Sequence, residues 1–418
     1  MPSIPFLRSA RDDDARPDDA DLAVTSVDQR PDADEERAEE TDDERVASAD
    51  AAPDDDPDAA LADMPAAPVG RWGPDVLGDG FTAQTVELLP DEDGPVVATV
   101  VRYRPQDDPQ MRDVGEPRYV MLHLHGWNDY FHQRELARAC AATGAAFYAL
   151  DLRRYGRSLR PGQLRGYVES LSSYDEDIHA ARDLIRADHP ELGDVVLMGH
   201  STGGLTAALW AHRHPGALRA LVLNAPWLEM QGSWLVRTLG QPVIERLARY
   251  QPRAALPLRD LGFYSRILAG TAHEVAELAP ESPDGQPAEP GEDPAVTGWQ
   301  IEPAWRTSPS AAIRPGWLAA VLAGHTQVAG GLAITCPVLV LASSTSLFAT
   351  RWSEEMRRAD TVIDVELTAR RALALGPHVT VVRVRDAVHD VLLSPAPVRG
   401  EAYRELTRWL RAYAGPAA

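Results

Sequence analysis

Alternating hydrophobic and polar positions mark the first predicted strands. Residues 81–88 (FTAQTVEL) alternate, 90–95 (PDEDGP) are rich in turn-forming residues, and 96–103 (VVATVVRY) form a second apolar run. Two such runs around a short turn predict an antiparallel hairpin. Residues 118–124 (RYVMLHL) are apolar on both faces, which is typical of a strand buried inside a parallel sheet.

Strand-like and helix-like segments then alternate along the chain. The predicted strands are 146–150, 194–198, 218–224, 336–341 and 379–384, and the predicted helices are 132–144, 173–190, 202–214, 364–376 and 400–415. A strand that is followed by a helix and then by another strand makes a right-handed crossover between parallel neighbours. The sequence therefore predicts an α/β fold with a mostly parallel, doubly wound sheet and a leading antiparallel hairpin.

The strand–helix alternation stops between residues 226 and 331. This stretch contains a helical pattern at 233–251, a polar loop rich in Pro and Gly at 281–294, and five of the ten Trp residues. We interpret it as a mainly helical cap, inserted between two parts of the sheet domain that comprise residues 67–225 and 332–418.

Charge distinguishes the beginning of the chain from the rest. Residues 1–65 hold 22 of the 63 acidic side chains and only 6 of the 41 basic ones. Residues 9–66 contain no aromatic side chain, and Pro recurs among the charges. Such a segment buries too little apolar surface to offset the entropy of ordering, so residues 1–66 are predicted to be a disordered acidic tail.

Composition excludes several classes of function. The body of the chain is mildly acidic and has no basic face, so nucleic-acid binding is disfavoured. Cys140 and Cys336 are the only cysteines, which fits a reducing compartment better than a disulfide scaffold. No apolar run is long enough for a signal peptide or a membrane span. We therefore expect a cytoplasmic protein without a membrane segment.

Residues 199–203 (GHSTG) form the pattern Gly-x-Ser-x-Gly between a predicted strand and a predicted helix. In this context the pattern indicates a sharp turn that exposes the hydroxyl of Ser201 above the sheet. Gly199 and Gly203 lack a Cβ, which lets the strand and the helix approach closely. Ser201 is therefore the candidate nucleophile, whereas His200 is interpreted as a packing residue.

A serine hydroxyl needs a base and an orienting acid, and in a sheet of this kind they follow it in the order acid, then His. His389 lies in 385–394 (RDAVHDVLLS), just beyond a predicted strand, where open α/β sheets place their ligands. His378 lies at the opposite end of that strand and is expected to face away. His325 lies in the insertion and is interpreted as a helix-surface residue.

The acid is expected after strand 336–341, but the adjacent residues 342–347 contain no carboxylate. Asp360 is the first choice, since it precedes a short apolar stretch. Asp364 is the second, although it is also explained as the N-cap of a helix. Glu354 and Glu355 are the remaining candidates.

Two backbone N–H groups are predicted to face a developing oxyanion. That of Thr202 lies at the start of the helix after the nucleophile. The second is expected in the loop after strand 118–124, where Gly126 allows a tight turn and leaves the N–H of Trp127 pointing inward. The alternative for this loop is an ordinary turn.

Together these residues resemble the α/β-hydrolase superfamily, and within it the serine aminopeptidase (S33) type that includes monoacylglycerol lipases and lysophospholipases. The matching segments are LHGWND (124–129), DLRRYGRS (151–158), GHSTGG (199–204), ADTVIDVE (359–366) and AVHDVLLS (387–394). The resemblance implies a catalytic Ser201, Asp360 and His389, an oxyanion hole at Trp127 and Thr202, and a cap over the substrate. The sequence departs from the family pattern at Arg154, where a small Gly is usual, and in the position of the acid, which comes about a dozen residues late.

The first functional hypothesis is a serine hydrolase of carboxylic esters that acts on a small, acyl- or lipid-like molecule through an acyl-enzyme, with no cofactor and no metal. The second is an aminopeptidase with the same residues, for which Glu229 and Glu245 of the insertion are candidates to hold a free amine. The third is a non-catalytic binding protein on the same scaffold.

Overall fold

The computed structural model describes residues 57–415, except for residues 112, 194, 232–233, 259 and 272–292. Most of the predicted acidic tail, residues 1–56, lies outside the described residues. Within the remainder of that tail, helix α1 spans Pro57–Ala62. No helix in the described part of the chain has both the length and the hydrophobicity needed to cross a bilayer.

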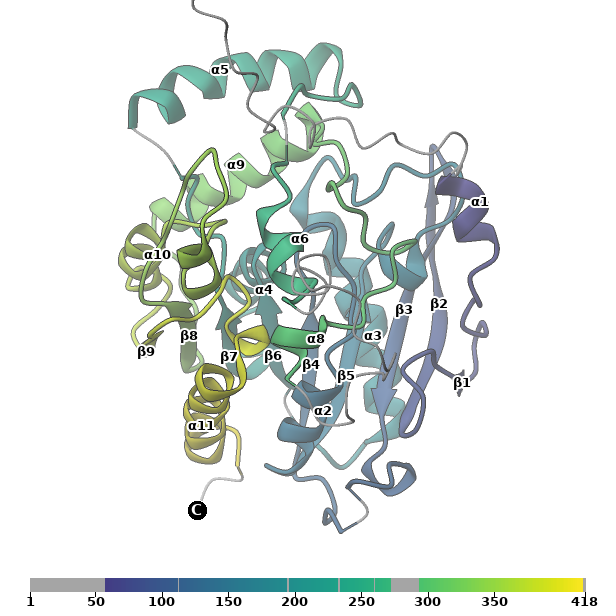
Figure 1. Ribbon diagram of the computed structural model, residues 1–418. Coiled ribbons are helices and arrows are strands. Elements are labelled where there is room, and N and C mark those ends of the chain that lie inside the picture. The colour runs from purple at the N-terminus through teal and green to yellow at the C-terminus, as the bar shows by residue number, and fades with distance from the viewer. Residues whose placement is uncertain are drawn as a thin grey trace, which may run out of the picture. The chain divides into compact units, whose positions relative to one another are not determined.

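A nine-stranded sheet forms the centre of the fold, in the order β1-β2-β3-β5-β4-β6-β7-β8-β9 (Figure 1). The strands are β1 (Gly73–Pro74), β2 (Phe81–Asp91), β3 (Gly94–Tyr103), β4 (Tyr119–Leu124), β5 (Ala145–Asp151), β6 (Val195–His200), β7 (Leu218–Asn224), β8 (Val338–Ser343) and β9 (Val379–Val384). Strands β1 to β3 are antiparallel, β3 pairs antiparallel with β5, and every later pair is parallel. The predicted fold class, a mostly parallel sheet with a leading hairpin, is therefore confirmed.

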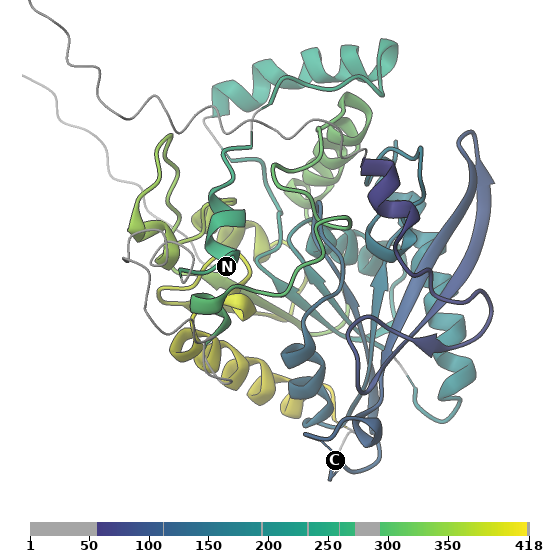
Figure 2. The same cartoon turned by 45° about the vertical axis from the view of Figure 1, so that its right-hand side comes forward.

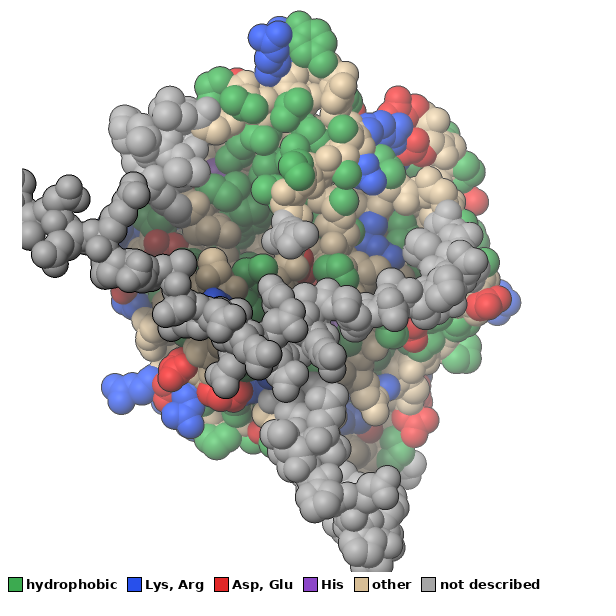
Figure 3. Space-filling model, turned by 45° about the horizontal axis from the view of Figure 1, so that its top comes forward, with side chains coloured by type: hydrophobic (Ala, Val, Ile, Leu, Met, Phe, Trp, Pro, Cys, Tyr) green, Lys and Arg blue, Asp and Glu red, His purple; other side chains and the backbone are tan. Residues whose placement is uncertain are grey.

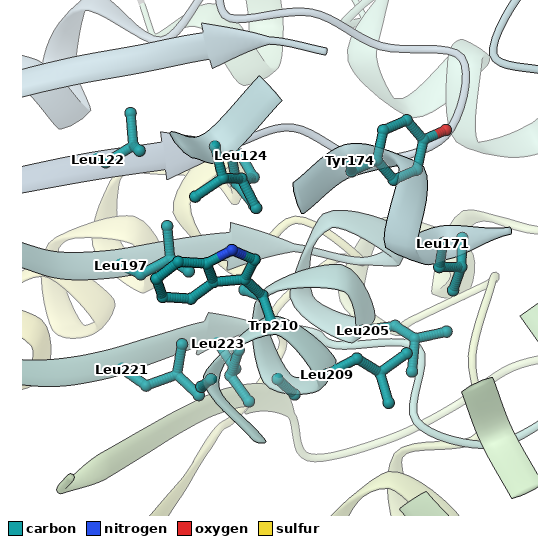
Figure 4. Close-up of a cluster of buried hydrophobic side chains, with 14 of the residues drawn as sticks. Leu122, Leu124, Leu171, Tyr174, Leu197, Leu205, Leu209, Trp210, Leu221 and Leu223 are labelled. Atoms are coloured by element: carbon teal, nitrogen blue, oxygen red, sulfur yellow. The ribbon is translucent and has the colours of Figure 1, made fainter. Parts of the chain in front are cut away.

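Helices cover both faces of the sheet. Helices α3 (Tyr174–Asp188), α4 (Thr202–Arg213), α9 (Pro315–Ala329) and α10 (Val365–Ala372) contribute to the hydrophobic cluster on one face, and α2 (Arg134–Ala141) and α11 (Ala396–Tyr413) to the cluster on the other. Figure 4 shows part of the first cluster, in which Trp210 of α4 lies against leucines of the neighbouring strands. Trp210 is fully buried. Burial of large apolar side chains on both faces explains why the central strands are hydrophobic throughout.

The insertion contributes helices α5 (Trp234–Tyr250), α6 (Phe263–Leu268), α8 (Pro294–Thr297) and α9. Figures 1 and 2 both show α5 at one extremity of the drawn structure, with α9 beneath it. Hydrophobic side chains gather on this side in Figure 3. Helix α9 belongs to the core rather than to a separate cap, since Trp317, Val321 and Val328 are buried in the cluster that α4 lines.

His325 of α9 does not lie on a helix surface, contrary to the sequence-based interpretation. Its side chain is buried, and Nε2 donates a hydrogen bond to the carbonyl of Trp227 at 2.9 Å. Burial lowers its pKa to about 4. The prediction was wrong because His325 lies on the buried face of α9 together with Val321 and Val328, whereas Thr326 and Gln327 occupy the exposed face.

The buried His123 of β4 predicts how the free energy of unfolding depends on pH. Neither of its ring nitrogens has a hydrogen-bond partner in the described structure, and burial lowers its pKa from 6.5 to about 3. The unfolded chain therefore binds a proton between these values that the folded chain does not, so the free energy of unfolding is highest above pH 6.5 and falls as the pH drops toward 3.

We expect His123→Phe to remove this loss, which is on the order of 2 kcal/mol at pH 5. The Phe131 ring already contacts His123 edge-on, with ring centroids 5.5 Å apart, so an aromatic ring without nitrogens suits the site. Chemical denaturation at pH 7.5 and pH 5 measures the difference. An unchanged pH dependence in the variant would contradict the role of His123.

Candidate active site

Ser201 occupies a strained backbone conformation between β6 and α4. Its φ of 51° and ψ of −116° are sparsely populated by residues with a side chain, a conformation that costs about 1–3 kcal/mol. Two hydrogen bonds hold it: its N–H donates to the carbonyl of Asn224 at 3.0 Å, and its carbonyl accepts from the N–H of Trp227 at 3.0 Å. The end of β7 thus fixes the turn that exposes the Ser201 side chain.

The glycines of the motif are required by close packing. A Cβ on Gly199 would collide with the carbonyl of Gly203, and a Cβ on Gly203 would collide with the carbonyl of His125. A side chain at either position would push the helix away from the strand or from the loop after β4. The structure thereby explains the residue types at both positions.

The side chains of Ser201, His389 and Asp360 lie in hydrogen-bond contact. Ser201 Oγ is 3.0 Å from His389 Nε2, and His389 Nδ1 donates to Asp360 Oδ2 at 2.9 Å. Asp360 is completely buried, and its Oδ1 accepts hydrogen bonds from the N–H groups of Val362 and Ile363. These two donors fix the carboxylate, so that its other oxygen faces the imidazole.

The late position of Asp360 in the sequence is resolved by the path of the chain after β8. The backbone leaves the sheet after Ser343, and residues 347–359 form an excursion that returns at Asp360. There, the N–H of Asp360 donates to the carbonyl of Thr345 and the N–H of Leu347 donates to the carbonyl of Asp360. The inserted residues thus leave Asp360 close to the carboxyl end of β8.

The other acidic candidates lie elsewhere. Asp364 caps α10 by accepting from the N–H groups of Glu366 and Leu367. Glu354 and Glu355 are exposed on the short helix Glu354–Arg358, where Glu354 pairs with Arg357.

The remaining histidines make other contacts. His378 is exposed at the start of β9, at the opposite end of that strand from His389. His200 packs against the ring of His389, with centroids 5.0 Å apart, and its Nδ1 donates to the carbonyl of Asn224. Burial lowers the pKa of His200, so its ring is neutral near pH 7.

The loop after β4 approaches Ser201 at Gly126. A Cβ there would stand 3.1 Å from both Ser201 Cβ and His200 Cδ2, so glycine is the residue that permits this approach. The next residue is Trp127, whose ring packs on Trp317 with centroids 4.0 Å apart. In the described structure, the N–H groups of Trp127 and Thr202 donate no hydrogen bond. Both donors remain available to a ligand.

Arg154, the residue that departs from the family pattern, has a structural role. It adopts the left-handed region at φ 63°, as the usual glycine would. Its guanidinium is buried, donates to the carbonyl of Tyr167, and pairs with Asp91 and Asp93 in the β2–β3 turn. The arginine therefore ties the loop after β5 to the hairpin.

A second buried network links the nucleophile turn to the loop of His389. Asp390 Oδ1 accepts from Asn224 Nδ2 at 2.6 Å, and Oδ2 accepts from Gln133 Nε2 at 2.7 Å. Asn224 Oδ1 in turn accepts from the N–H of Val391 at 3.3 Å. Asn224 therefore contacts the nucleophile turn through its carbonyl and the His389 loop through its side chain.

A pocket of about 280 Å³ opens beside Ser201 and His389. Most of its other lining residues come from the loop after β4 and from the insertion, and they include Asp129, Leu258, Tyr264 and Arg306. The described residues contain no group of three or more His, Cys, Asp or Glu side chains arranged to hold a metal ion.

Comparison with solved structures identifies the fold. A monoglyceride lipase from Saccharomyces cerevisiae, solved as a soluble variant with a substrate analogue, superposes with a TM-score of 0.50 over 79% of this chain and 96% of that one, at 13% identity. A lipase in its open form also superposes with a TM-score of 0.50, over 79% of this chain and 99% of that one, at 17% identity. This chain has the α/β-hydrolase fold.

Parts of the chain also match known sequences. Residues 115–282 match the model of the serine aminopeptidase S33 family. The monoacylglycerol lipase of Mycolicibacterium smegmatis is 36% identical over 112 residues, which is 27% of this chain and 39% of that protein. The human protein named 1-acylglycerol-3-phosphate O-acyltransferase ABHD5 is 30% identical over 104 residues, 25% of this chain and 28% of that protein. The chain thus spans well under half the length of these two relatives.

Several residues around the site escaped sequence reasoning. Asp390 directly follows His389, and Asn224 ends a predicted strand. Both positions lie at the carboxyl edge of the sheet, which could have indicated a role at the site. Arg306 gave no such signal, because its position at the site depends on how the insertion folds back over the loop after β4.

Removal of the Asn224 side chain tests the network. In Asn224→Ala, Asp390 loses its shortest hydrogen bond and the N–H of Val391 loses its acceptor, so the free energy of unfolding should fall by about 1–3 kcal/mol. Thermal or chemical denaturation measures the change, with the exposed Gln110→Ala as the control. Equal stability of the two variants would show that the network contributes nothing.

Proposed function

We propose that this protein is a serine hydrolase that cleaves carboxylic esters through an acyl-enzyme on Ser201. The observation that carries the proposal is the continuous contact from Ser201 Oγ through the His389 ring to the buried Asp360. A hydroxyl, an imidazole and a carboxylate in this order are what activation of a serine requires.

In the proposed first step, His389 Nε2 takes the proton of Ser201 as Oγ attacks the ester carbonyl. The bond from Oγ to the carbonyl carbon forms, and the electron pair of the C=O bond moves to the oxygen. The N–H groups of Trp127 and Thr202 would stabilise that oxyanion, and each such donor contributes about 3–4 kcal/mol to the transition state.

The tetrahedral intermediate then collapses, and the alcohol leaves with the proton from His389. Water, deprotonated by the same imidazole, attacks the acyl-enzyme and releases the carboxylic acid. Asp360 orients the ring, because it holds the proton on Nδ1 and leaves Nε2 to face Ser201. It also stabilises the imidazolium that forms in each step.

One of the two carboxylates predicted to hold a free amine is already paired, which favours ester cleavage over aminopeptidase activity. Glu229 is engaged by Arg371, with Oε2 2.9 Å from Nε, and so its carboxylate is already neutralised. The partial sequence matches to a monoacylglycerol lipase and to an acylglycerol-phosphate acyltransferase point in the same direction, since both names refer to acyl esters.

Steady-state kinetics test the proposal. Aryl esters of graded chain length should be hydrolysed faster than aminoacyl arylamides, and Ser201→Ala should lower kcat by a factor on the order of 10⁴ or more. Faster arylamide cleavage would favour the aminopeptidase hypothesis. Absence of turnover on every ester, with a folded protein, would favour the non-catalytic one.

The role of the acid is tested by two isosteric variants. Asp360→Asn should lower kcat on the order of 10³- to 10⁴-fold, because an amide in place of the carboxylate no longer holds the correct His389 tautomer. Asp364→Asn should leave kcat unchanged, since Asn caps a helix as well as Asp does. The reverse order of effects would transfer the acid role to Asp364.

A further inference from the structure

The pocket beside Ser201 contains a buried cation whose hydrogen-bond donors are unused. The side chain of Arg306 is only 10% exposed and lines the pocket. Its Nη1 is buried and has no partner, and its guanidinium donates no hydrogen bond to any described residue. Buried polar groups are normally paired, so an unpaired guanidinium in a pocket requires an explanation.

Arg306 is held in position without using its donors. Its guanidinium carbon lies 5.3 Å from the centroid of the Tyr264 ring, within the range of a cation–π contact. The nearest carboxylate oxygen is Oδ1 of Asp129, 3.9 Å from Nε, which is beyond hydrogen-bond distance. A purely structural pair of Arg and Asp would be expected to form one or two short hydrogen bonds.

The two acidic side chains that line the pocket, Asp129 and Asp260, accept hydrogen bonds from backbone donors. Asp260 accepts from the N–H groups of Gly262 and Ser310, and Asp129 Oδ1 accepts from the N–H of Tyr130 at 3.0 Å. Burial by itself raises the pKa of Asp129, but Arg306 and the neighbouring histidines hold it below its usual value. Neither carboxylate accepts a hydrogen bond from Arg306, so the donors of this guanidinium stay available to a ligand.

We propose that Arg306 binds an anionic group of the substrate, a carboxylate or a phosphate carried by the ester that Ser201 attacks. This inference rests on the proposed esterase function and narrows its substrate class. A planar guanidinium matches both groups, because two of its N–H donors can contact two oxygens of one anion. The negative charge of Asp129 opposes anion binding, so we expect it to limit the preference for anionic over neutral substrates.

Two pairs of substrates locate the anion. The 4-nitrophenyl monoester of adipic acid and its neutral methyl diester place the charge on the acyl side. Monodecanoylglycerol phosphate and monodecanoylglycerol place it on the alcohol side. In one of the two pairs, the wild-type kcat/KM should be about 10- to 100-fold higher for the anionic member, the range expected for hydrogen bonds to a charged group.

Three variants then separate a binding role from a structural one. Arg306→Gln should bring the ratio of anionic to neutral kcat/KM close to one, mainly through KM. Asp129→Asn should raise the ratio, since it removes the opposing charge. Arg408→Gln, whose side chain is 74% exposed and pairs with Glu405, is the matched control and should leave the ratio unchanged. A merely structural role of Arg306 would not move the ratio in opposite directions in the first two variants.

Calorimetric titration of glycerol 3-phosphate, adipate and glycerol into the wild type and Arg306→Gln supplies a readout that does not depend on turnover. The site is supported if the wild type binds glycerol 3-phosphate or adipate more tightly than glycerol and Arg306→Gln loses this binding. This result would support the site even if no ester were hydrolysed. Turnover of neutral esters without any anion preference or anion binding would overturn the Arg306 site alone. Loss of all ester turnover, with anion binding retained, would overturn only the esterase proposal.

Discussion

The unfavourable backbone conformation of Ser201 is the constraint on which the site depends. A residue with a side chain stays at φ 51° only if its surroundings hold it there. The surroundings here are the packing of Gly199 against Gly203 and two hydrogen bonds, one to Asn224 at the end of β7 and one from Trp227. This conformation presents the hydroxyl to His389 and starts α4 at the next residue. The N–H of Thr202 is left without a partner for the same reason, because the first N–H groups of a helix have no intrahelical acceptor.

Three loops meet at this turn, and each is fixed by buried contacts. The loop after β4 approaches through Gly126, the chain after β8 returns to the sheet at Asp360, and the loop after β9 is held by Asp390. Asn224 connects the last of these to the nucleophile turn. The distances from Ser201 to His389 and from His389 to Asp360 thus follow from contacts that lie outside the three side chains themselves.

Much of the fold could be predicted because hydrophobic periodicity distinguishes strands from helices over most of the chain. The hairpin and the parallel strands followed from that pattern, and the choice of Ser201 as candidate nucleophile followed from the Gly-x-Ser-x-Gly turn. Asp360 could be chosen over Asp364 because a helix cap already explained Asp364, and the structure places each where this reasoning put it. Arg154 departs from the family pattern in residue type, but it adopts the left-handed backbone conformation expected of the usual glycine.

Other features could not be read from local sequence. Residues 226–331 were interpreted as a cap because the strand–helix alternation stops there, whereas the packing of α9 against α4 is a tertiary contact. The same limitation explains the error at His325 and the omission of Arg306, whose neighbours Asp129 and Tyr264 are distant in the chain.

The identity of the nucleophile is the central claim, and covalent labelling tests it most directly. A fluorophosphonate probe reacts with an activated serine, so the full-length protein should acquire one adduct, which peptide mapping should place on Ser201 and which Ser201→Ala should abolish. An adduct on another residue, or undiminished labelling of Ser201→Ala, would contradict the assignment.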